Sequence, residues 1–588
     1  MPPLSNEKLA TSSRTTTRLP PVVWCGLIVI VTLLSFHVRP FISLHLIAQY
    51  EEAGTKICPQ VDNLFPERNA ETWAGARERT ASEAFKMRAI DWLAGAVRIP
   101  TESFDDMQAV GVDPRWDVFA TFHAYLAQAF PLVHGNLKLR KINTYGLLYE
   151  WRGSNESLKP VLLTAHQDVV PVDPSTADSW DHPPYSGYFD GTRIWGRGTI
   201  DDKNGLIGIL AAVESLLQIG FTPTRTFVMA FGFDEEVNGL EGAAQLAKTL
   251  LATYGEDSFA FILDEGAGLI EMFGIVAAFP CVAEKGYLDV VVEVTSPGGH
   301  SSIPPDHTSI GMLAAMIVEY EDNPHQLQLS RESTPYRTVQ CLAKYSPTMS
   351  PAAKRLVADA AHSDAALAAL GALLSKDPLY RTQIGTTTAV DVVRGGVKSN
   401  ALPEAAYAIV NHRILAESSV AAVRAHDTAL LAPLAVRFNL TYTAFDVDIS
   451  SPGARASGML ALRDLDAASA LEPAPLTPTD GPDAAPYQLL SGSIRAAYAA
   501  RRAAGGERGN YTVPVVPSTM LGNTDTRYYW ALSRHIFRYG HGNSAGRGPE
   551  DAQKGMHTTN ESIDADDLVE GIRFFVMLVL NADEWLMV

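Results

Sequence analysis

The chain has 588 residues, of which 46% are hydrophobic and 19% are charged, and its formal net charge is −19. Length and balance predict a globular protein with more than one domain. The acidic charge argues against a nucleic-acid-binding protein, whose surface carries a basic patch.

The first expected element is a membrane anchor. Residues 1–21 are polar and include Lys8, Arg14 and Arg18, and the following run 22–38, VVWCGLIVIVTLLSFHV, contains no Lys, Arg, Asp or Glu. The run is at the lower length limit for a membrane-spanning helix. No small-residue cleavage site follows it, so we favour a signal anchor over a cleaved signal peptide. Because the basic residues precede the run, the tail 1–21 should be cytoplasmic and the bulk of the chain lumenal.

Glycosylation and cysteine patterns are compatible with a lumenal protein. Asn-x-Ser/Thr sequons, which are weak evidence on their own, occur at Asn155, Asn439, Asn510 and Asn560. Outside the apolar run the chain has three cysteines, Cys58, Cys281 and Cys341, whose pairing the sequence does not decide. They allow at most one intrachain disulfide, which excludes a disulfide-rich scaffold.

After a polar, irregular stretch at 39–80, which we interpret as a stalk, strand and helix patterns alternate over 81–284. Apolar runs such as PVLLTAH, TFVMAFGF and FAFILDEG predict strands, and NGLIGILAAVESLLQIG predicts a buried helix. This alternation is typical of an α/β domain with a mostly parallel central sheet and helices on both faces.

The pattern changes at 285, where the order β-α-β-β-α-β predicts a smaller α+β domain of the split βαβ, ferredoxin-like kind over 285–448. An Ala-rich helical insertion is expected within it at 322–385. Residues 449–588 then return to the first domain, so the smaller domain is an inserted lid or dimerisation-like domain.

Polar clusters follow the predicted strands, on what should be one edge of the sheet. They are His166 with Asp168, Asp201 with Asp202, Asp234 to Glu236, Asp264 with Glu265, and His557 near the final helix. Taken singly, a loop histidine or a helix-capping aspartate explains each of the first two clusters. Together, so many acids at one edge would be unfavourable without a cation. Mixed imidazole and carboxylate ligands suit Zn²⁺, with Co²⁺ or Mn²⁺ as alternatives.

These motifs resemble those of the di-zinc amidohydrolases, a family that includes aminoacylases, dipeptidases, bacterial glutamate carboxypeptidase and the fungal carboxypeptidase S group. The resemblance rests on AHQDVVP, GRGTIDDKNG, DEEVNG, LDEG, SPGGHSSIPP, GNTDTRYY and GMHTTNESI, which appear in the family's order between residues 165 and 563. The DDKN form and the N-terminal anchor are most similar to the carboxypeptidase S group and to a secreted relative, the N-acyl-amino-acid synthase/hydrolase.

The resemblance implies a role for each site residue. It implies two Zn²⁺ per chain held by His166, Asp201, Glu236, Asp264 and His557, with Asp201 shared and Glu265 as the alternative to Asp264. Glu235 would be the general base and acid acting on a metal-activated bridging water, and Asp168 would orient His166. Three residues are expected to contact substrate: His300 at the oxyanion, Arg527 at the substrate carboxylate, and Asn400.

The function expected from this resemblance is zinc-dependent carboxypeptidase activity on the amide bond next to a free C-terminal carboxylate in short peptides. The alternative is N-acyl-amino-acid hydrolysis or synthesis, and a catalytically dead receptor or binding ectodomain is less favoured. By resemblance the compartment is the vacuole, with secretion after processing as the other option. A homodimer is typical of the family, but the insertion at 322–385 argues against the usual one.

Overall fold

The computed structural model describes residues 57–450, 456–466, 470–504, 512–544 and 555–585. The predicted tail and anchor, 1–38, and the sequon at Asn510 lie outside the described residues. Within those five ranges, no helix is both long and apolar enough to cross a membrane. Residues from Gln60 onward form one compact unit, and the following description concerns that unit.

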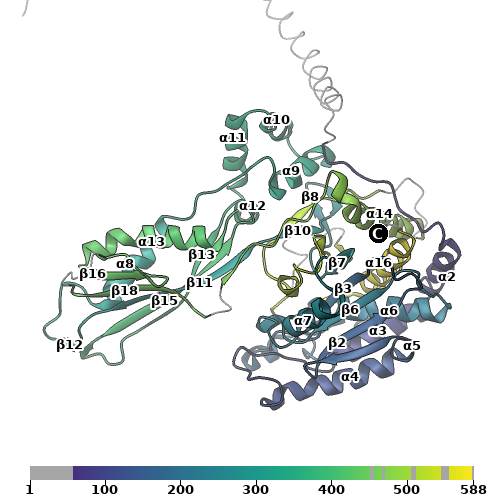
Figure 1. Ribbon diagram of the computed structural model, residues 1–588, viewed down its shortest axis with the longest axis horizontal. Helices are drawn as coiled ribbons and strands as arrows, with labels where there is room; N and C mark the ends of the chain where they lie inside the picture. Colours follow the sequence, from purple (N-terminus) through teal and green to yellow (C-terminus); the bar gives the residue numbers. More distant parts are fainter. Residues whose placement is uncertain (1–56, 451–455, 467–469, 505–511, 545–554, 586–588) are drawn as a thin grey trace, which may run out of the picture. The chain divides into compact units, whose positions relative to one another are not determined.

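A large eight-stranded sheet forms the centre of the first domain, in the order β1-β2-β6-β3-β7-β21-β10-β20 (Figure 1). Its middle strands, β6, β3, β7 and β21, are parallel, and antiparallel pairs occur towards both edges. β3 and β6 are buried along their whole length, as expected for apolar runs covered on both faces. The strands are β1 (Lys138–Ile142), β2 (Gly146–Trp151), β3 (Val161–His166), β6 (Phe227–Gly232), β7 (Phe261–Asp264), β10 (Cys281–Glu284), β20 (Ser518–Met520) and β21 (Ile536–Arg538).

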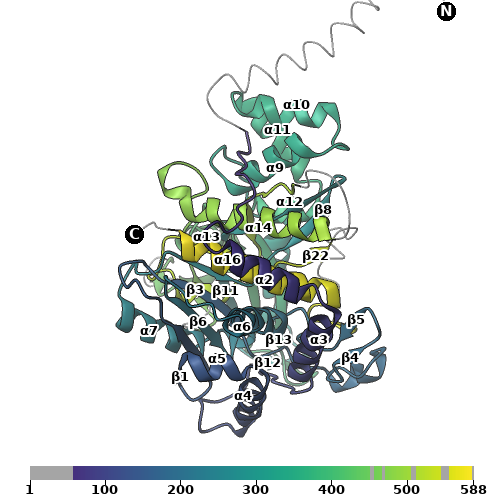
Figure 2. The same cartoon turned by 90° about the vertical axis from the view of Figure 1, so that its right-hand side faces the viewer.

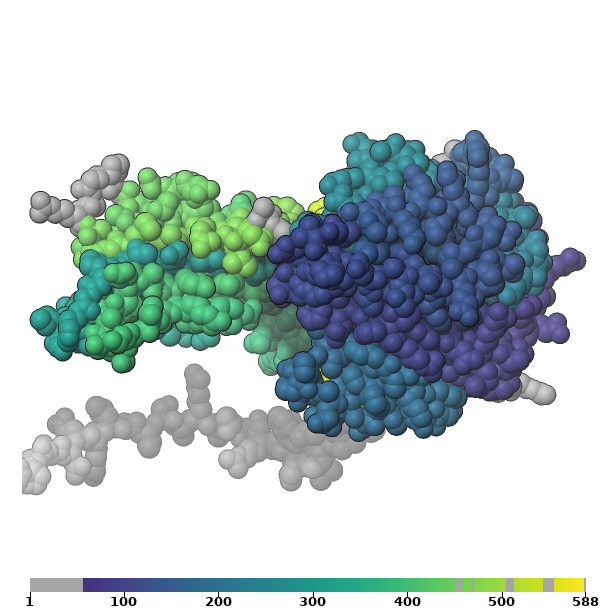
Figure 3. Space-filling view, turned by 90° about the horizontal axis from the view of Figure 1, so that it is seen from below, coloured from purple at the N-terminus to yellow at the C-terminus, as the bar shows by residue number. Residues whose placement is uncertain are grey.

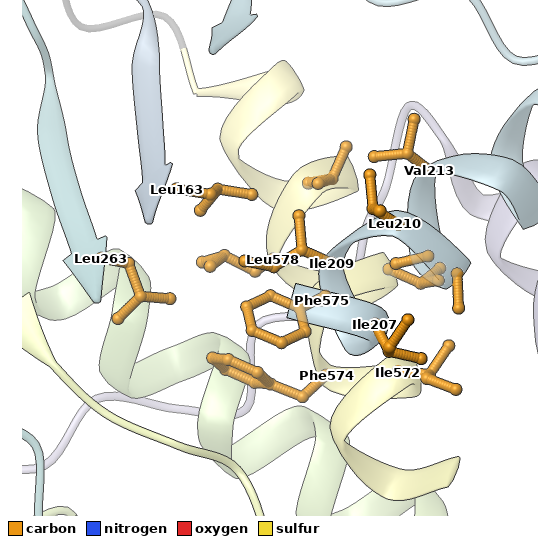
Figure 4. Close-up of a cluster of buried hydrophobic side chains, with 14 of the residues drawn as sticks. Leu163, Ile207, Ile209, Leu210, Val213, Leu263, Ile572, Phe574, Phe575 and Leu578 are labelled. Atoms are coloured by element: carbon orange, nitrogen blue, oxygen red, sulfur yellow. The ribbon is translucent and has the colours of Figure 1, made fainter. Parts of the chain in front are cut away.

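Helices cover both faces of this sheet, which confirms the predicted fold class. Successive residues of β3 point to opposite faces: Leu163 joins a core with α6 and α16, whereas Leu162 joins a separate core with α7. Figure 4 shows Leu163 and Leu263 of the sheet facing Ile209 of α6 and Phe575 of α16. The helices are α3 (Glu83–Val97), α4 (Val118–Ala129), α5 (Pro131–Asn136), α6 (Lys203–Gln218), α7 (Ala243–Tyr254), α14 (Ala485–Ala504) and α16 (Ala565–Glu584).

The predicted stalk at 39–80 is wrong in its second half, because residues Ala70–Thr80 form helix α2. Trp73 and Ala76 of α2 are buried in the same core as α6 and α16, and the three helices lie side by side (Figure 2). The helix is polar on average, so its apolar face was too narrow to stand out in the sequence.

In the space-filling view, residues of the first part of the chain, purple to blue, form much of the visible surface of the first domain (Figure 3).

A second sheet forms the smaller domain, with the strand order β13-β15-β11-β18-β16-β17. Helices α8 (Ser309–Asp322) and α13 (Val420–Arg437) pack on it and enclose a core of their own. The strands are β11 (Gly286–Thr295), β13 (Thr387–Gly395), β15 (Ala405–Ile414), β16 (Leu440–Ala444), β17 (Val447–Asp448) and β18 (Gly458–Asp464), and β19 (Ala470–Leu471) pairs with β11.

The predicted end of the smaller domain at 448 is too early. β18 pairs antiparallel with β11 and parallel with β16, so residues up to at least 464 belong to this sheet. Between α8 and β13 the chain forms four helices, α9 (Thr334–Tyr345), α10 (Pro351–Ala360), α11 (Asp364–Leu374) and α12 (Pro378–Gln383). Cys341 of α9 is disulfide-bonded, whereas Cys281 of β10 is a buried free thiol.

Shorter strands complete the fold. β4 (Tyr188–Phe189), β5 (Arg193–Trp195) and β23 (Ser562–Asp564) form one small sheet, and β8 (Leu269–Met272), β9 (Ile275–Ala278) and β22 (Asn543–Ser544) form another. β12 (Gly299–His300) pairs with β14 (Ala401–Leu402). Short 3₁₀ helices include η3 (Glu235–Val237) and η5 (Asp525–Tyr528).

A buried histidine in α4 predicts a loss of stability in mild acid. His123 is buried, and its Nε2 lies 2.9 Å from Gln167 Oε1. Burial lowers the pKa of His123 to about 4, so between pH 6.5 and 4 the unfolded chain binds a proton that the folded chain does not. The free energy of unfolding should therefore fall by about 3 kcal/mol as pH drops through this window.

The matched variant is His123→Gln, which keeps a hydrogen-bonding side chain but cannot titrate. Urea midpoints measured from pH 7 to pH 4 should fall less steeply for His123→Gln than for the wild type. Equal slopes would show that His123 does not contribute to the acid sensitivity.

Candidate metal centre

Neighbouring parallel strands bring the predicted site residues to one edge of the large sheet. His166 is the last residue of β3 and pairs with Gly232 at the end of β6, and Asp264 ends β7 on the other side of β3. The turn η3, with Glu235 and Glu236, begins shortly after β6. Because the carboxyl ends of parallel strands meet at the same edge, these side chains converge there.

Asp201 and His557 come from segments far apart in the chain that a small sheet holds together. Asp201 lies between β5 and α6, and His557 lies shortly before β23, which pairs antiparallel with β5. A buried ion pair joins the same two segments, with Arg197 Nη1 2.8 Å from Glu561 Oε2. Glu561 also accepts a hydrogen bond of 2.8 Å from the backbone N–H of Ile200.

Asp201 lies between the two histidines. Its Oδ1 is 3.0 Å from His166 Nε2, and its Oδ2 is 3.0 Å from His557 Nε2. Glu236 Oε2 lies 3.3 Å from the same nitrogen of His557. The sequence-predicted residues His166, Asp201, Glu236 and His557 therefore form one contiguous cluster, with both oxygens of the central carboxylate facing an imidazole.

Glu265, rather than Asp264, lies against His166. Glu265 Oε1 is 3.6 Å from His166 Nε2, and the residue belongs with His166 and Asp202 to one of two groups at this edge whose ligand atoms could hold a metal ion; the other is His166, Asp201 and Glu236. Asp264 belongs to neither of these groups. Its side chain is buried, but Glu265 is the carboxylate that lies within 3.6 Å of His166, so the geometry favours the alternative that the sequence left open.

Asp168 contacts both His166 and the turn that carries Glu235 and Glu236. Its Oδ1 is 3.3 Å from His166 Nδ1, and its carboxylate accepts hydrogen bonds of 3.1 Å from the backbone N–H groups of both Glu235 and Glu236. Ser103 Oγ donates a further hydrogen bond of 2.7 Å to it. Asp168 therefore fixes the ring of His166 and the turn that carries Glu235 and Glu236 at the same time.

The cluster carries more negative charge than its neighbours neutralise. Burial raises the pKa of Glu235, Glu236 and Glu265, and nearby carboxylates raise it further. Burial would also raise the pKa of Asp201, but hydrogen bonds from His166 and His557 outweigh it and lower that pKa. Hydrogen bonds to Asp201 and Glu236 raise the pKa of His557 to about 10.

Several buried carboxylate oxygens in this cluster have no hydrogen-bond partner among the described residues. They include Glu236 Oε1 and Asp202 Oδ2. Buried, unpartnered carboxylates beside two imidazoles are what a divalent cation requires, because its charge offsets both their repulsion and their burial. The donor set of nitrogen and oxygen atoms fits zinc.

A comparison with known protein families assigns the chain to one of them. The model of peptidase family M20/M25/M40 matches residues 162–581, which include every member of the cluster. The chain belongs to this family. The predicted family is thereby confirmed, and a metal cofactor is part of this enzyme.

Relatives that match over most of their length support the same family assignment. The chain is 38% identical to carboxypeptidase S of Saccharomyces cerevisiae over 507 residues, covering 85% of each chain. It is 30% identical to the N-fatty-acyl-amino acid synthase/hydrolase of Mus musculus, covering 86% of this chain and 90% of the relative. The fold matches human carnosine dipeptidase 1 with a TM-score of 0.57 at 14% identity, over 88% of this chain and 100% of that one.

His300 and Asn400, two of the predicted substrate contacts, lie beside each other in the smaller domain. His300, on β12, is exposed, and its Nδ1 accepts a hydrogen bond of 3.1 Å from the N–H of Ser302. Asn400 precedes β14, the partner of β12, and its carbonyl accepts from the N–H of Ser301 at 3.4 Å. Neither belongs to the metal-binding groups at the sheet edge.

Arg527, the third predicted substrate contact, lies on η5 beside the turn η3. Its Nη2 donates to the carbonyl of Asn238 at 2.5 Å. Asn238 ends the turn that carries Glu235 and Glu236, so Arg527 is tied to the same segment as the predicted base.

Asp525 is a buried carboxylate beside the turn η3 that the sequence analysis did not single out. It is buried, and burial together with the charge of Asp234 raises its pKa. A side chain at Gly232 or Gly239 would collide with its carboxylate, because a Cβ at either position would overlap one of the two oxygens. The absence of a side chain at both glycines therefore leaves room for Asp525 beside the turn. The NTD motif was the signal in the sequence that could have indicated Asp525.

Proposed function

We propose that this protein is a zinc-dependent carboxypeptidase that hydrolyses the amide bond next to a free C-terminal carboxylate in short peptides. The observation that carries the proposal is the cluster around Asp201, with both oxygens 3.0 Å from a histidine nitrogen. The identity of 38% to a relative named carboxypeptidase S supports the substrate class.

We assign two zinc ions to this cluster. His166 and Glu265 would hold one, Glu236 and His557 would hold the other, and Asp201 would bind both. When bound, the metal pair would polarise the scissile carbonyl and lower the pKa of a water molecule. Glu265 takes the place predicted for Asp264, because Glu265 lies against His166.

Glu235 is the proton-transfer group in this proposal. It lies next to Glu236 on η3 but does not belong to either metal-binding group at the edge. Burial raises its pKa, which favours a carboxyl that accepts a proton and later returns it to the leaving amine. Asp168 keeps His166 in one ring orientation, since the pair are 3.3 Å apart.

The substrate carboxylate is assigned to Arg527. Its planar guanidinium can bind a carboxylate through two parallel hydrogen bonds, and it donates to the carbonyl of Asn238, which ends the turn that carries Glu235. His300 is assigned to the oxyanion and Asn400 to a contact with the substrate, and the two residues are neighbours in the β12–β14 hairpin region.

A second candidate function is hydrolysis or synthesis of N-acyl amino acids. The relative from Mus musculus, named N-fatty-acyl-amino acid synthase/hydrolase, favours it at 30% identity. Such a substrate also ends in a free carboxylate beside an amide, so the same residues would serve it.

We further propose that the catalytic part is lumenal, with the vacuole as the compartment. The apolar run at 22–38 would anchor it, and Asn439, which is exposed, would be available for glycosylation. We also propose that the protein can form a homodimer. The helices at 334–383 make the dimer typical of the family less favourable.

The experiment is a substrate panel run with and without a chelator. N-blocked dipeptides with a free C-terminal carboxylate should be cleaved faster than N-fatty-acyl amino acids, and the same dipeptides amidated at the C-terminus should resist cleavage. Chelation should stop cleavage and added Zn²⁺ should restore it. Preferential cleavage of N-fatty-acyl amino acids would select the second function, and cleavage that a chelator leaves unchanged would overturn both.

A further inference from the structure

A second group of metal-ligand side chains lies in the smaller domain, outside the catalytic cluster. It consists of His325, His412 and Asp427, whose ligand atoms all lie within 4.8 Å of one another. His325 follows α8, His412 is on β15, and Asp427 is on α13. His412 and Asp427 are completely buried, and His325 is partly buried.

The contacts within this group fit a single cation. His412 Nε2 is 3.0 Å from Asp427 Oδ2, close to the separation of about 3.3 Å between two donors around one tetrahedral zinc ion. His325 Nε2 is buried and has no hydrogen-bond partner among the described residues. The ring of His325 is edge-on to that of His412, with centroids 5.4 Å apart. A cation beside the imidazole–carboxylate pair would give this buried nitrogen a partner.

Hydrogen bonds from neighbouring residues hold these side chains in the orientation that metal binding requires. Thr388 Oγ1 lies 3.2 Å from His412 Nδ1 and fixes the ring, leaving Nε2 towards Asp427. The other oxygen of Asp427 is 3.2 Å from Nδ1 of His426, whose ring stacks on His325 at 3.9 Å between centroids. His426 is 32% exposed, so this side of the group is open to solvent.

The charges around the group allow a cation. Lys285 is a positively charged side chain near His325, and its Nζ donates to the carbonyls of Thr382 and Gly385 at 2.8 and 2.7 Å. The ammonium group is thereby held by two other acceptors.

We propose that His325, His412 and Asp427 bind one structural Zn²⁺, with His426 or a water molecule in the fourth position. The site would join the two ends of the four-helix segment α9–α12 to the sheet. His325 precedes that segment and Thr388 follows it, and Gln328 N–H donates to the Ile384 carbonyl at 2.7 Å between them. This inference does not depend on the proposed peptidase activity.

The test compares zinc content in the purified full-length protein and its variants by elemental analysis. The wild type should carry one more zinc per chain than His325→Ala, which changes only a partly buried side chain. His307→Ala removes an exposed histidine of the same domain and should keep the wild-type zinc content. His557→Ala should lose catalytic zinc and peptidase activity but keep the zinc of the smaller domain.

Cobalt substitution gives a second readout. Co²⁺ in a four-coordinate site has visible absorption bands, and the bands of the His557→Ala protein should decrease in the double variant His325→Ala/His557→Ala. Equal zinc content in wild type and His325→Ala, together with unchanged cobalt bands in the double variant, would overturn the site and leave a hydrogen-bonded cluster without metal. That result would not affect the peptidase proposal, which the substrate panel tests.

Discussion

Replacing Glu235 by glutamine is expected to lower kcat by about 10²- to 10⁴-fold, the range for loss of a general acid–base group. Glutamine has nearly the same shape but cannot accept the proton and return it to the leaving amine. Because Glu235 is outside both metal-binding groups at the sheet edge, the variant should keep its metal. The measurements are kcat on an N-blocked dipeptide and zinc content by elemental analysis.

The matched control for this variant is Glu241→Gln, which lies a few residues further along the same loop. The Glu241 side chain accepts a hydrogen bond of 2.6 Å from Asn143 Nδ2 and belongs to neither metal-binding group at the sheet edge. This control should keep kcat within a small factor. A Glu235→Gln enzyme with near-normal kcat would remove Glu235 from the mechanism, and one that loses its zinc would make it a ligand.

Replacing Arg538 by methionine is expected to lower the free energy of unfolding by about 3–5 kcal/mol, as for other broken buried ion pairs. Arg538 and Glu284 are both completely buried, with Nη2 2.6 Å from Oε2. Thr526 Oγ1 lies within hydrogen-bond distance of both charged groups. The variant would leave the Glu284 carboxylate without its counter-charge between β10 and β21.

The control is the double variant Glu284→Gln/Arg538→Met, in which neither charge is present. It should recover at least half of the lost stability, measured as the urea midpoint of unfolding. If the double variant were as unstable as the single one, loss of packing rather than an unpaired charge would be responsible.

The fold and the main cluster could be predicted because their signals are local. β3, β6 and β7 are short apolar runs that end in polar residues, and parallel pairing brings such ends to one edge. His557 could be included only through the family's motif order, since it is separated from Asp201 by 356 positions.

The choice between Asp264 and Glu265 could not be made from the sequence. Asp264 is the last residue of β7 and Glu265 the first residue after it, so the two side chains point to different sides of the strand end. Either carboxylate is chemically suitable, and only the path of the backbone after β7 decides which one reaches His166.

The other misses have a common cause, which is contact between distant segments. α2 resembles a polar stalk until Trp73 is seen against α16, and β18 belongs to the smaller sheet only because it pairs with β11. His325 and His412 follow no ligand spacing that a sequence motif would reveal, because the three-dimensional fold alone brings them to Asp427.

The position of β21 between β7 and β10 determines when the large sheet can be completed during synthesis of the chain. β7 and β10 leave the ribosome early, but the strand that joins them, and the helix α16 that covers β3, are translated after the whole smaller domain. The smaller domain, in contrast, can fold as soon as β18 and β19 have emerged, because among the described strands none after β19 joins its sheet. Nascent chains therefore hold an open sheet edge until translation ends, and this period is when they most need protection from aggregation.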